Sequence, residues 1–177
     1  MGALIDDMLK FSRLSRAPMN PVEVDLSLLV REALDELRAA EPERQVEAVV
    51  APDLKAEGDA SLLRAVLQNF VGNAWKYTSR RQKAHLEFGA IDREGERVFF
   101  IRDDGAGFDM AYAHRLFGAF QRLHGAHEFE GNGIGLATAH RIIRRHGGRV
   151  WAEGAVDQGA TFYFTLTAKP DSTQSTP

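Results

Sequence analysis

Cysteine is absent from the 177-residue chain, which excludes disulfide bonds and thiolate metal sites and makes a reducing, cytoplasmic location the expectation. Long apolar runs are also absent: no stretch approaches the roughly 18 to 20 residues that a membrane span requires, so no direct membrane contact is expected. An excess of one charge is lacking too, because 22 Lys and Arg face 25 Asp and Glu and leave a net charge of −3. This balance removes the electrostatic argument for a general nucleic-acid binder.

The length suits one domain of about 140 residues with an extra element at one end. Residues 1–16 place apolar side chains at helical spacing, and Pro18 and Pro21 then interrupt the pattern. We therefore expect a helix and a joint that belong to another packing unit, then the main domain, then a polar and disordered tail. The expected boundaries are 1–20, 22–168 and 169–177.

The main domain alternates between helical and strand patterns. Asp25 and Asp59 each stand directly before a helical apolar pattern and are predicted N-caps. The segment between Phe108 and Gly131 has only short apolar groups, and its length predicts a mobile, functional lid. The patterns predict, in chain order, a helix from Asp25, a strand at 46–50, a helix from Asp59 to near Tyr77, a hairpin of 84–91 and 97–102, a helix at 134–145 and a closing hairpin of 149–152 and 160–166. Helices are thus interleaved with an antiparallel sheet.

The first chemical motif lies on the predicted helix that ends near Tyr77. Asn69, Asn73 and Lys76 follow at positions i, i+4 and i+7 and share one helix face. Amide oxygens suit Mg²⁺, a hard cation that binds few protein oxygens, and a lysine neutralises phosphate as a point charge. Asn73 is the first choice for the metal contact, with Asn69 beside it. Considered alone, the pattern is also that of a solvated helix face.

The second motif follows the predicted hairpin. Gly105 and Gly107 let the backbone turn tightly and let a flat ligand approach it. A carboxylate just before them accepts a hydrogen bond from an exocyclic amine such as that of adenine, and spacing alone does not separate Asp103 from Asp104. As an isolated pattern, this is also a loop or a calcium-like turn.

The third motif, Gly131-Asn132-Gly133-Ile134-Gly135-Leu136, opens a helix, where free amides and the helix dipole attract phosphate. A dinucleotide fingerprint is the alternative, but it requires a preceding parallel strand and a further glycine where Ala137 and Thr138 stand. The three motifs in this order favour ATP binding.

With these motifs the chain resembles the catalytic, ATP-binding domain of a sensor histidine kinase, in the family that includes gyrase, Hsp90 and MutL ATPase domains. The resemblance covers residues 22–168 and implies the Bergerat fold: an α+β, two-layer sandwich whose mixed, mostly antiparallel sheet is covered on one face by three helices, here with an extra N-terminal helix. The similar segments are 69–77 (N box), 103–107 (G1 box), 117–122 (F box) and 131–136 (G2 box). The amino-acid sequence around these segments is especially similar to that of phytochrome-like and PAS-linked kinases.

The resemblance implies ATP and Mg²⁺ as cofactors and assigns roles to individual residues. Asn73 and Asn69 would hold Mg²⁺, and Asp103 would read the adenine amine in preference to Asp104. Catalytic roles would fall to Asn69, Lys76 and Arg122. The remaining cofactor-binding residues would be Tyr77, Gly105, Gly107, Phe108, Gly131, Gly133, Ile134, Gly135, Leu136 and Thr161, the last supporting the adenine end.

Position 69 bears on the reaction type. Hydrolytic relatives place a Glu there to activate water, whereas an amide takes up no proton at neutral pH. Asn69 therefore favours phosphoryl transfer over hydrolysis, and transfer needs mostly positioning and charge neutralisation. The alternatives are a non-catalytic nucleotide-binding or interaction module and, ranked lower, an ATPase of the same family.

The family's phosphoacceptor histidine has no counterpart among the six histidines of this chain. Residues 1–16 resemble only the second helix of the dimerisation hairpin and offer a possible homodimer contact. We therefore expect no autophosphorylation by this chain alone, and the implied partners are an acceptor-histidine domain of the same kinase and a response regulator. His146 is predicted to cap a helix as a cation, and His140 to be a packing or surface residue.

Overall fold

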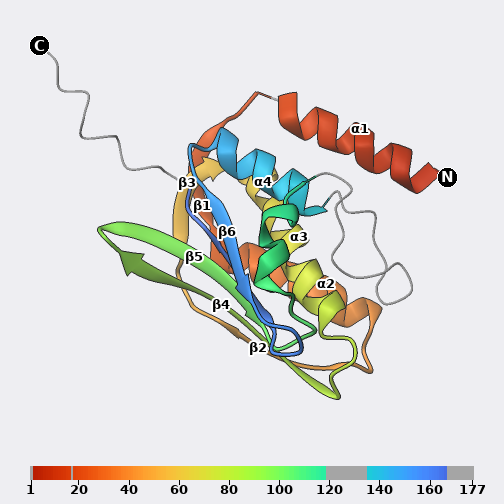
Figure 1. Ribbon diagram of the computed structural model, residues 1–177. Coiled ribbons are helices and arrows are strands. Elements are labelled where there is room, and N and C mark those ends of the chain that lie inside the picture. The colour runs from red at the N-terminus through yellow and green to blue at the C-terminus, as the bar shows by residue number, and fades with distance from the viewer. Residues whose placement is uncertain (1, 17, 119–134, 167–177) are drawn as a thin grey trace, which may run out of the picture.

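The computed structural model describes residues 2–16, 18–118 and 135–166 and contains one five-stranded sheet with helices packed against it (Figure 1). The strand order is β2-β4-β5-β7-β6, in which β2 and β4 run parallel and the other pairs run antiparallel. The strands are β2 Gln45–Val50, β4 Lys83–Arg93, β5 Glu96–Asp103, β6 Val150–Gly154 and β7 Ala160–Phe164. The predicted mixed, mostly antiparallel sheet is confirmed.

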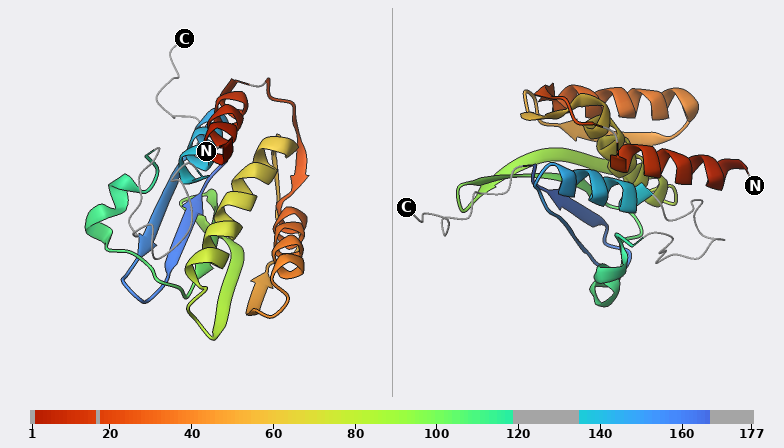
Figure 2. Two further views of the ribbon diagram at one scale, coloured as in Figure 1. Left: turned by 90° about the vertical axis from the view of Figure 1, so that its right-hand side faces the viewer. Right: turned by 90° about the horizontal axis from the view of Figure 1, so that it is seen from above.

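Three helices cover one face of the sheet: α2 Leu26–Ala40, α3 Ala60–Tyr77 and α4 Gly135–Arg145. In Figure 2 the helices lie to one side of the curved sheet, and α1 Gly2–Arg16 lies outside this layer, alongside α4. The predicted two-layer α+β sandwich with an extra helix is therefore correct. Among the residues described, no helix is long and apolar enough to cross a membrane.

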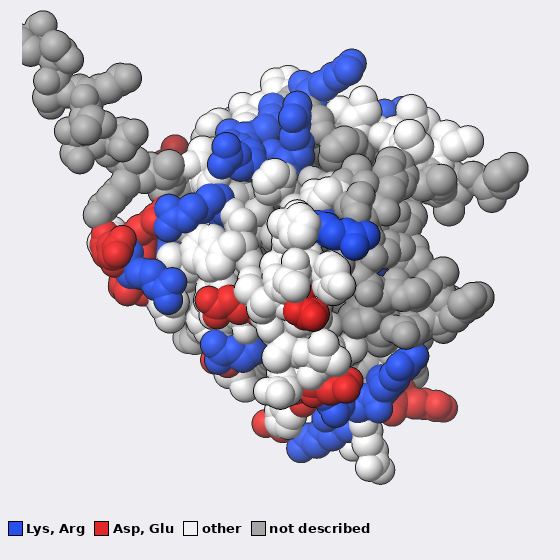
Figure 3. Space-filling view, viewed as in Figure 1, with Lys and Arg blue, Asp and Glu red and all other residues white. Residues whose placement is uncertain are grey.

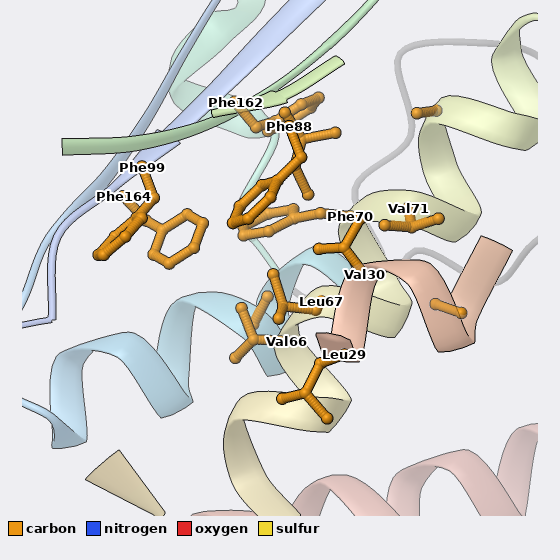
Figure 4. Close-up of a cluster of buried hydrophobic side chains, with 14 of the residues drawn as sticks. Leu29, Val30, Val66, Leu67, Phe70, Val71, Phe88, Phe99, Phe162 and Phe164 are labelled. Carbon is orange, nitrogen blue, oxygen red and sulfur yellow. The ribbon is translucent and has the colours of Figure 1, made fainter. Parts of the chain in front are cut away.

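The core between the layers is rich in phenylalanine. Phe70 of α3 is fully buried, and its ring stacks on Phe162 and Phe164 of β7 with ring centroids 5.6 Å apart in each case (Figure 4). Phe99 of β5 extends the stack to Phe164 at 5.4 Å. Because Phe70 and Asn69 are neighbours on α3, this packing fixes the rotation of the helix that carries the first motif.

Both predicted helix caps form. The Asp25 carboxylate accepts a hydrogen bond from the Leu28 amide, and the Asp59 carboxylate accepts one from the Leu62 amide, each at 3.0 Å. His146 also caps a helix, since its Nδ1 donates to the Ile142 carbonyl at 2.8 Å. The predicted capping role is thereby confirmed, and Nε2 accepts from the Asp59 amide at 3.1 Å, which joins the end of α4 to the start of α3.

The sequence patterns missed a second, two-stranded sheet. β1 Pro21–Asp25 pairs antiparallel with β3 Lys55–Asp59 beside the body of the domain. Each strand has only five residues. β1, PVEVD, opens with a proline and alternates over just two valines, and β3, KAEGD, has one apolar side chain, so the strand signal is weak in both. The amide of Asn20, in the joint after α1, donates to Asp59 Oδ2 at 2.9 Å. The joint is thereby attached to the first turn of α3.

Replacing Asp59 by Ala should lower the free energy of unfolding by about 1–2 kcal/mol at pH 7, because the cap and the Asn20 contact are both lost. Asp25→Ala removes a cap of the same kind in an exposed setting and should cost less, about 0.5–1 kcal/mol. Urea unfolding of the two variants measures the difference, and equal effects would contradict a special role for Asp59.

The same contact predicts a pH dependence. Hydrogen bonds from the Asn20 and Leu62 amides lower the pKa of Asp59. Its contribution to stability is therefore complete above the unfolded-state pKa of about 3.9 and is lost as the pH falls through the lower pKa of the folded state. As the pH is lowered, Asp59→Ala should accordingly lose less stability than the wild-type protein. Urea unfolding of both proteins at several acidic pH values measures this difference.

Candidate nucleotide site

Asp103 ends β5 and is buried, with 6% of its surface exposed. Its Oδ1 accepts the Gly105 amide at 2.8 Å, and the residue opposite it on β7 is Ala160, whose amide also hydrogen-bonds the carboxylate. Burial raises the pKa of the Asp103 carboxyl to about 7; the two amides lower it and the neighbouring Asp104 raises it. Burial makes the ionised form of this carboxyl group costly, so a ligand that donates a hydrogen bond to it would stabilise that form.

Asp104 is occupied differently. Its carboxylate accepts the His85 amide at 3.0 Å, and its own amide donates to the His85 carbonyl at 3.3 Å, so it extends the pairing between β4 and β5. Of the two adjacent carboxylates, Asp103 is the buried one. The geometry supports Asp103 as the base-reading residue that the resemblance implies.

The turn after Asp103 requires glycine at two positions. A Cβ on Gly105 would lie 2.3 Å from the Tyr77 carbonyl oxygen. Gly107 has a φ of +61°, and a Cβ there would lie 1.9 Å from the Ala155 carbonyl oxygen. The Ala106 amide donates to the same Tyr77 carbonyl at 2.9 Å, so the second motif is attached to the end of the helix that carries the first.

The asparagine face of α3 lies partly exposed beside this turn. Asn69, Asn73, Lys76 and Tyr77 are all of intermediate exposure. Lys76 Nζ lies 4.7 Å from the centre of the Tyr77 ring. A Cβ on Gly135 would lie 3.0 Å from Asn69 Oδ1, so the first motif also meets the start of α4, where the third motif ends. The described parts of all three motifs thus converge.

Two residues predicted to bind the cofactor, Phe108 and Leu136, pack in or against the hydrophobic core. Phe108 is 5% exposed and belongs to the main core, where its ring packs so close to Gly154 that a Cβ there would lie 2.7 Å from it. It supports the turn from within and offers little surface to a ligand. Leu136 is partly buried at the edge of the same core.

Thr161 is not brought to the site. It lies beside Tyr163 on the face of β7 opposite Ala160 and Phe162, and its hydroxyl accepts Arg102 Nε at 3.3 Å on the face of the sheet away from the helices. Side chains alternate between faces along a strand, so Thr161 and Asp103 point to opposite sides of the sheet. The role implied for Thr161 is wrong, and Ala160 occupies the position nearest Asp103.

Some predicted residues lie outside the part of the chain that the structure describes: Arg122, Gly131, Gly133, Ile134, most of the predicted lid and the polar tail. The described start of the lid segment contains a 3-10 helix, η1 Met110–Arg115, followed by Phe117. The Phe117 ring stacks on His140 of α4 at 5.8 Å and meets Phe162 edge-on at 6.2 Å. His140, predicted to be a packing or surface residue, thus packs against Phe117, and burial, with a contribution from Arg144, lowers its pKa.

Charged side chains gather in separate regions of the surface. Figure 3 shows Lys and Arg gathered over the region of α4, whose last turn contains Arg144 and Arg145, while both signs alternate lower on the same face. One basic residue that the sequence patterns did not single out, Arg81, contacts the glycine turn directly. It follows the first motif without any spacing signal of its own.

Comparison with known proteins settles the family. Residues 58–170 match the family described as histidine kinase-, DNA gyrase B-, and HSP90-like ATPase, and this segment includes all three motifs. The chain belongs to this family. Relatives over 94% and 93% of this chain include two proteins named as histidine kinases, FilI of Methanothrix harundinacea and AruS of Pseudomonas aeruginosa, so the domain is an ATP-binding catalytic domain of the histidine kinase type.

The relatives and solved structures agree with the assignment. Cyanobacterial phytochrome A of Nostoc sp. is 34% identical over 94% of this chain, and the adaptive-response sensory kinase SasA of Thermosynechococcus vestitus is 34% identical over the same share. The chain spans only 22% and 45% of these relatives, respectively.

The solved structures extend the agreement to the fold. The mycobacterial sensor histidine kinase MprB has a TM-score of 0.69 at 22% identity, covering 84% of this chain and 99% of its own. Full-length ShkA in complex with AMPPNP has a TM-score of 0.71 at 30% identity, covering 95% of this chain and 36% of its own. The family and the nucleotide complex of a neighbour support ATP binding.

Proposed function

We propose that this domain binds Mg-ATP between α3 and the 103–107 turn and presents the γ-phosphate to a histidine on a separate dimerisation segment. The observation that carries the proposal is the buried Asp103 beside a glycine turn that is bonded to the end of α3. An amine on a flat base satisfies this acceptor, while a carbonyl at the same place would face it acceptor to acceptor. The turn would hold the base, and the C-terminal half of α3, with Asn69, Asn73 and Lys76, would face the phosphates.

The side chains on α3 fit the implied Mg²⁺. Asn69 and Asn73 supply neutral oxygen donors on one helix face, and Lys76 supplies a positive charge one turn later. When bound, the ion neutralises phosphate charge. Asn69 holds no proton-accepting group at neutral pH, so it positions ligands without activating water, and this favours a transferase over an ATPase.

Calorimetric titration tests the proposal. ATP and ADP should bind with nanomolar-to-micromolar dissociation constants in the presence of Mg²⁺, more weakly in its absence, and Asn73→Ala should remove most of the difference. Absence of binding by either nucleotide would contradict the proposal. Steady release of phosphate from ATP that is lost in Asn69→Ala would instead indicate the hydrolytic alternative.

We further propose that α1 pairs with a helix of a partner, either the acceptor segment or a second copy of this chain. Ile5, Met8 and Leu9 are 58%, 47% and 50% exposed although they lie at helical spacing. Each side chain is about half exposed, so burying the remainder supplies about half of the roughly 1.5–3 kcal/mol that full burial gives. Light scattering should detect self-association at high concentration that Met8→Glu abolishes, and a strict monomer would contradict homodimerisation.

A further inference from the structure

Arg81 lies in the exposed connection between α3 and β4, yet its guanidinium makes three contacts with backbone carbonyls. Its Nε donates to the Asp104 carbonyl at 2.8 Å. Its Nη2 donates to the carbonyls of Asp157 at 2.6 Å and Gly105 at 3.4 Å. One side chain therefore joins the turn after β5 to the loop between β6 and β7.

The two loops that Arg81 joins both contain residues with positive φ, and one of these, Asp157, is not a glycine. Gly107 in one, and Asp157 and Gly159 in the other, all adopt positive φ values of 61°, 60° and 86°. The loops meet directly through the Asp157 amide, which donates to the Ala106 carbonyl at 2.7 Å. Carbonyl oxygens that converge in this way repel one another unless a cation or donor lies between them, and a planar guanidinium supplies several donors in a fixed geometry.

The contact with Asp104 extends to the base-reading carboxylate through a single peptide group. The peptide between Asp104 and Gly105 accepts Arg81 Nε at its carbonyl and donates from its amide to Asp103 Oδ1 at 2.8 Å. Hydrogen bonds in series polarise one another, so the charged donor at one end strengthens the bond at the other. The same peptide plane also fixes the direction from which Asp103 is held.

We propose that Arg81 is a positioning residue for base recognition, which orients the Asp104–Gly105 peptide and through it the Asp103 carboxylate. The inference rests on the proposed function, because it assigns to Arg81 the selection of a base with an exocyclic amine. Arg81 does not touch the base, and its effect is on the discrimination between an amine and a carbonyl.

The test compares ADP with inosine diphosphate, which carries a carbonyl in place of the amine. In Arg81→Ala the affinity for ADP should fall about tenfold while the affinity for inosine diphosphate stays nearly constant, so the ratio of the two collapses. Arg81→Lys, with a point charge in place of the fork, should restore part of the ratio. Arg38→Ala on α2 removes the same charge at an exposed site and should leave the ratio unchanged.

A second readout is independent of nucleotide. Hydrogen exchange of the Gly105 amide, followed by NMR in the free protein, should accelerate in Arg81→Ala. An unchanged exchange rate, an unchanged ratio, or an equal loss of both nucleotides would overturn the inference. Failure of the wild-type protein to bind either nucleotide would count against the proposed function, whereas an unchanged Gly105 exchange rate would count against Arg81 alone.

Discussion

Replacing Asp103 by Asn is expected to weaken the binding of adenine nucleotides at least about 100-fold, roughly 3 kcal/mol, because the amide presents a donor where the base amine needs an acceptor. Asp104→Asn is the matched control: it makes the same change of charge one residue away, at a carboxylate that bonds the His85 amide. Its nucleotide affinity should stay within a few-fold of wild type. Similar losses in both variants would contradict the assignment of Asp103.

Asp103→Asn should also make the nucleotide-free domain more stable. Burial raises the folded-state pKa of Asp103 to about 7, against about 3.9 in the unfolded chain. Between these values the unfolded chain releases a proton that the folded domain retains, so stability falls as the pH rises from about 4 to 7. The ionised group therefore disfavours folding at pH 8 by up to about 4 kcal/mol, and Asp103→Asn removes this cost.

Two measurements separate these effects. Urea unfolding at pH 5 and pH 8 should show the gain in stability only at the higher pH. Titration of the wild-type protein with ADP should give an affinity that rises with pH through about 7 and then levels off, since the ionised carboxylate is the acceptor. A flat affinity profile in wild type, or equal stability of the two proteins at pH 8, would contradict the raised pKa.

The second large effect is expected at Gly107. An alanine there would hold a positive φ and place its Cβ 1.9 Å from the Ala155 carbonyl oxygen, so the turn must open. Gly107→Ala should cost roughly 2–5 kcal/mol of stability and abolish nucleotide binding with it. Thermal unfolding and ADP titration measure the two losses.

Gly72 supplies the control for this substitution. It lies within α3, and a Cβ there meets nothing within 4 Å. Gly72→Ala should therefore raise stability by about 0.5–1 kcal/mol, because alanine restricts the unfolded chain and favours the helix. Equal effects of the two substitutions would show that the close approach at Gly107 is not what requires glycine.

Features carried by local patterns were predictable from the sequence. The apolar periodicity located α2, α3 and α4, and aspartates before the apolar faces marked two N-caps that the structure forms. The three motifs indicated a nucleotide site, and the family match confirms ATP binding. These features are local because each depends on residues within one or two helical turns or one hairpin.

Features that depend on long-range pairing were not predictable in this way. β1 and β3 pair across the intervening α2 and β2, and their five residues each give only two alternating valines in β1 and one apolar side chain in β3. Thr161 was misplaced because a shift of one residue along a strand reverses the face, and only the pairing of Asp103 with Ala160 reveals it. Arg81 was missed because its acceptors are backbone carbonyls, which leave no trace in the sequence.

We propose that the domain positions ATP so that its γ-phosphoryl group passes to a histidine that another segment supplies, with ADP as the leaving group. The direct measurement mixes the chain with Mg²⁺, γ-labelled ATP and a separately produced acceptor-helix domain of a phytochrome-type histidine kinase, and then follows the label. The account predicts acid-labile label on the acceptor histidine, dependent on Mg²⁺ and absent with Asp103→Asn. Nucleotide binding by the wild-type chain with no label on the acceptor would contradict it.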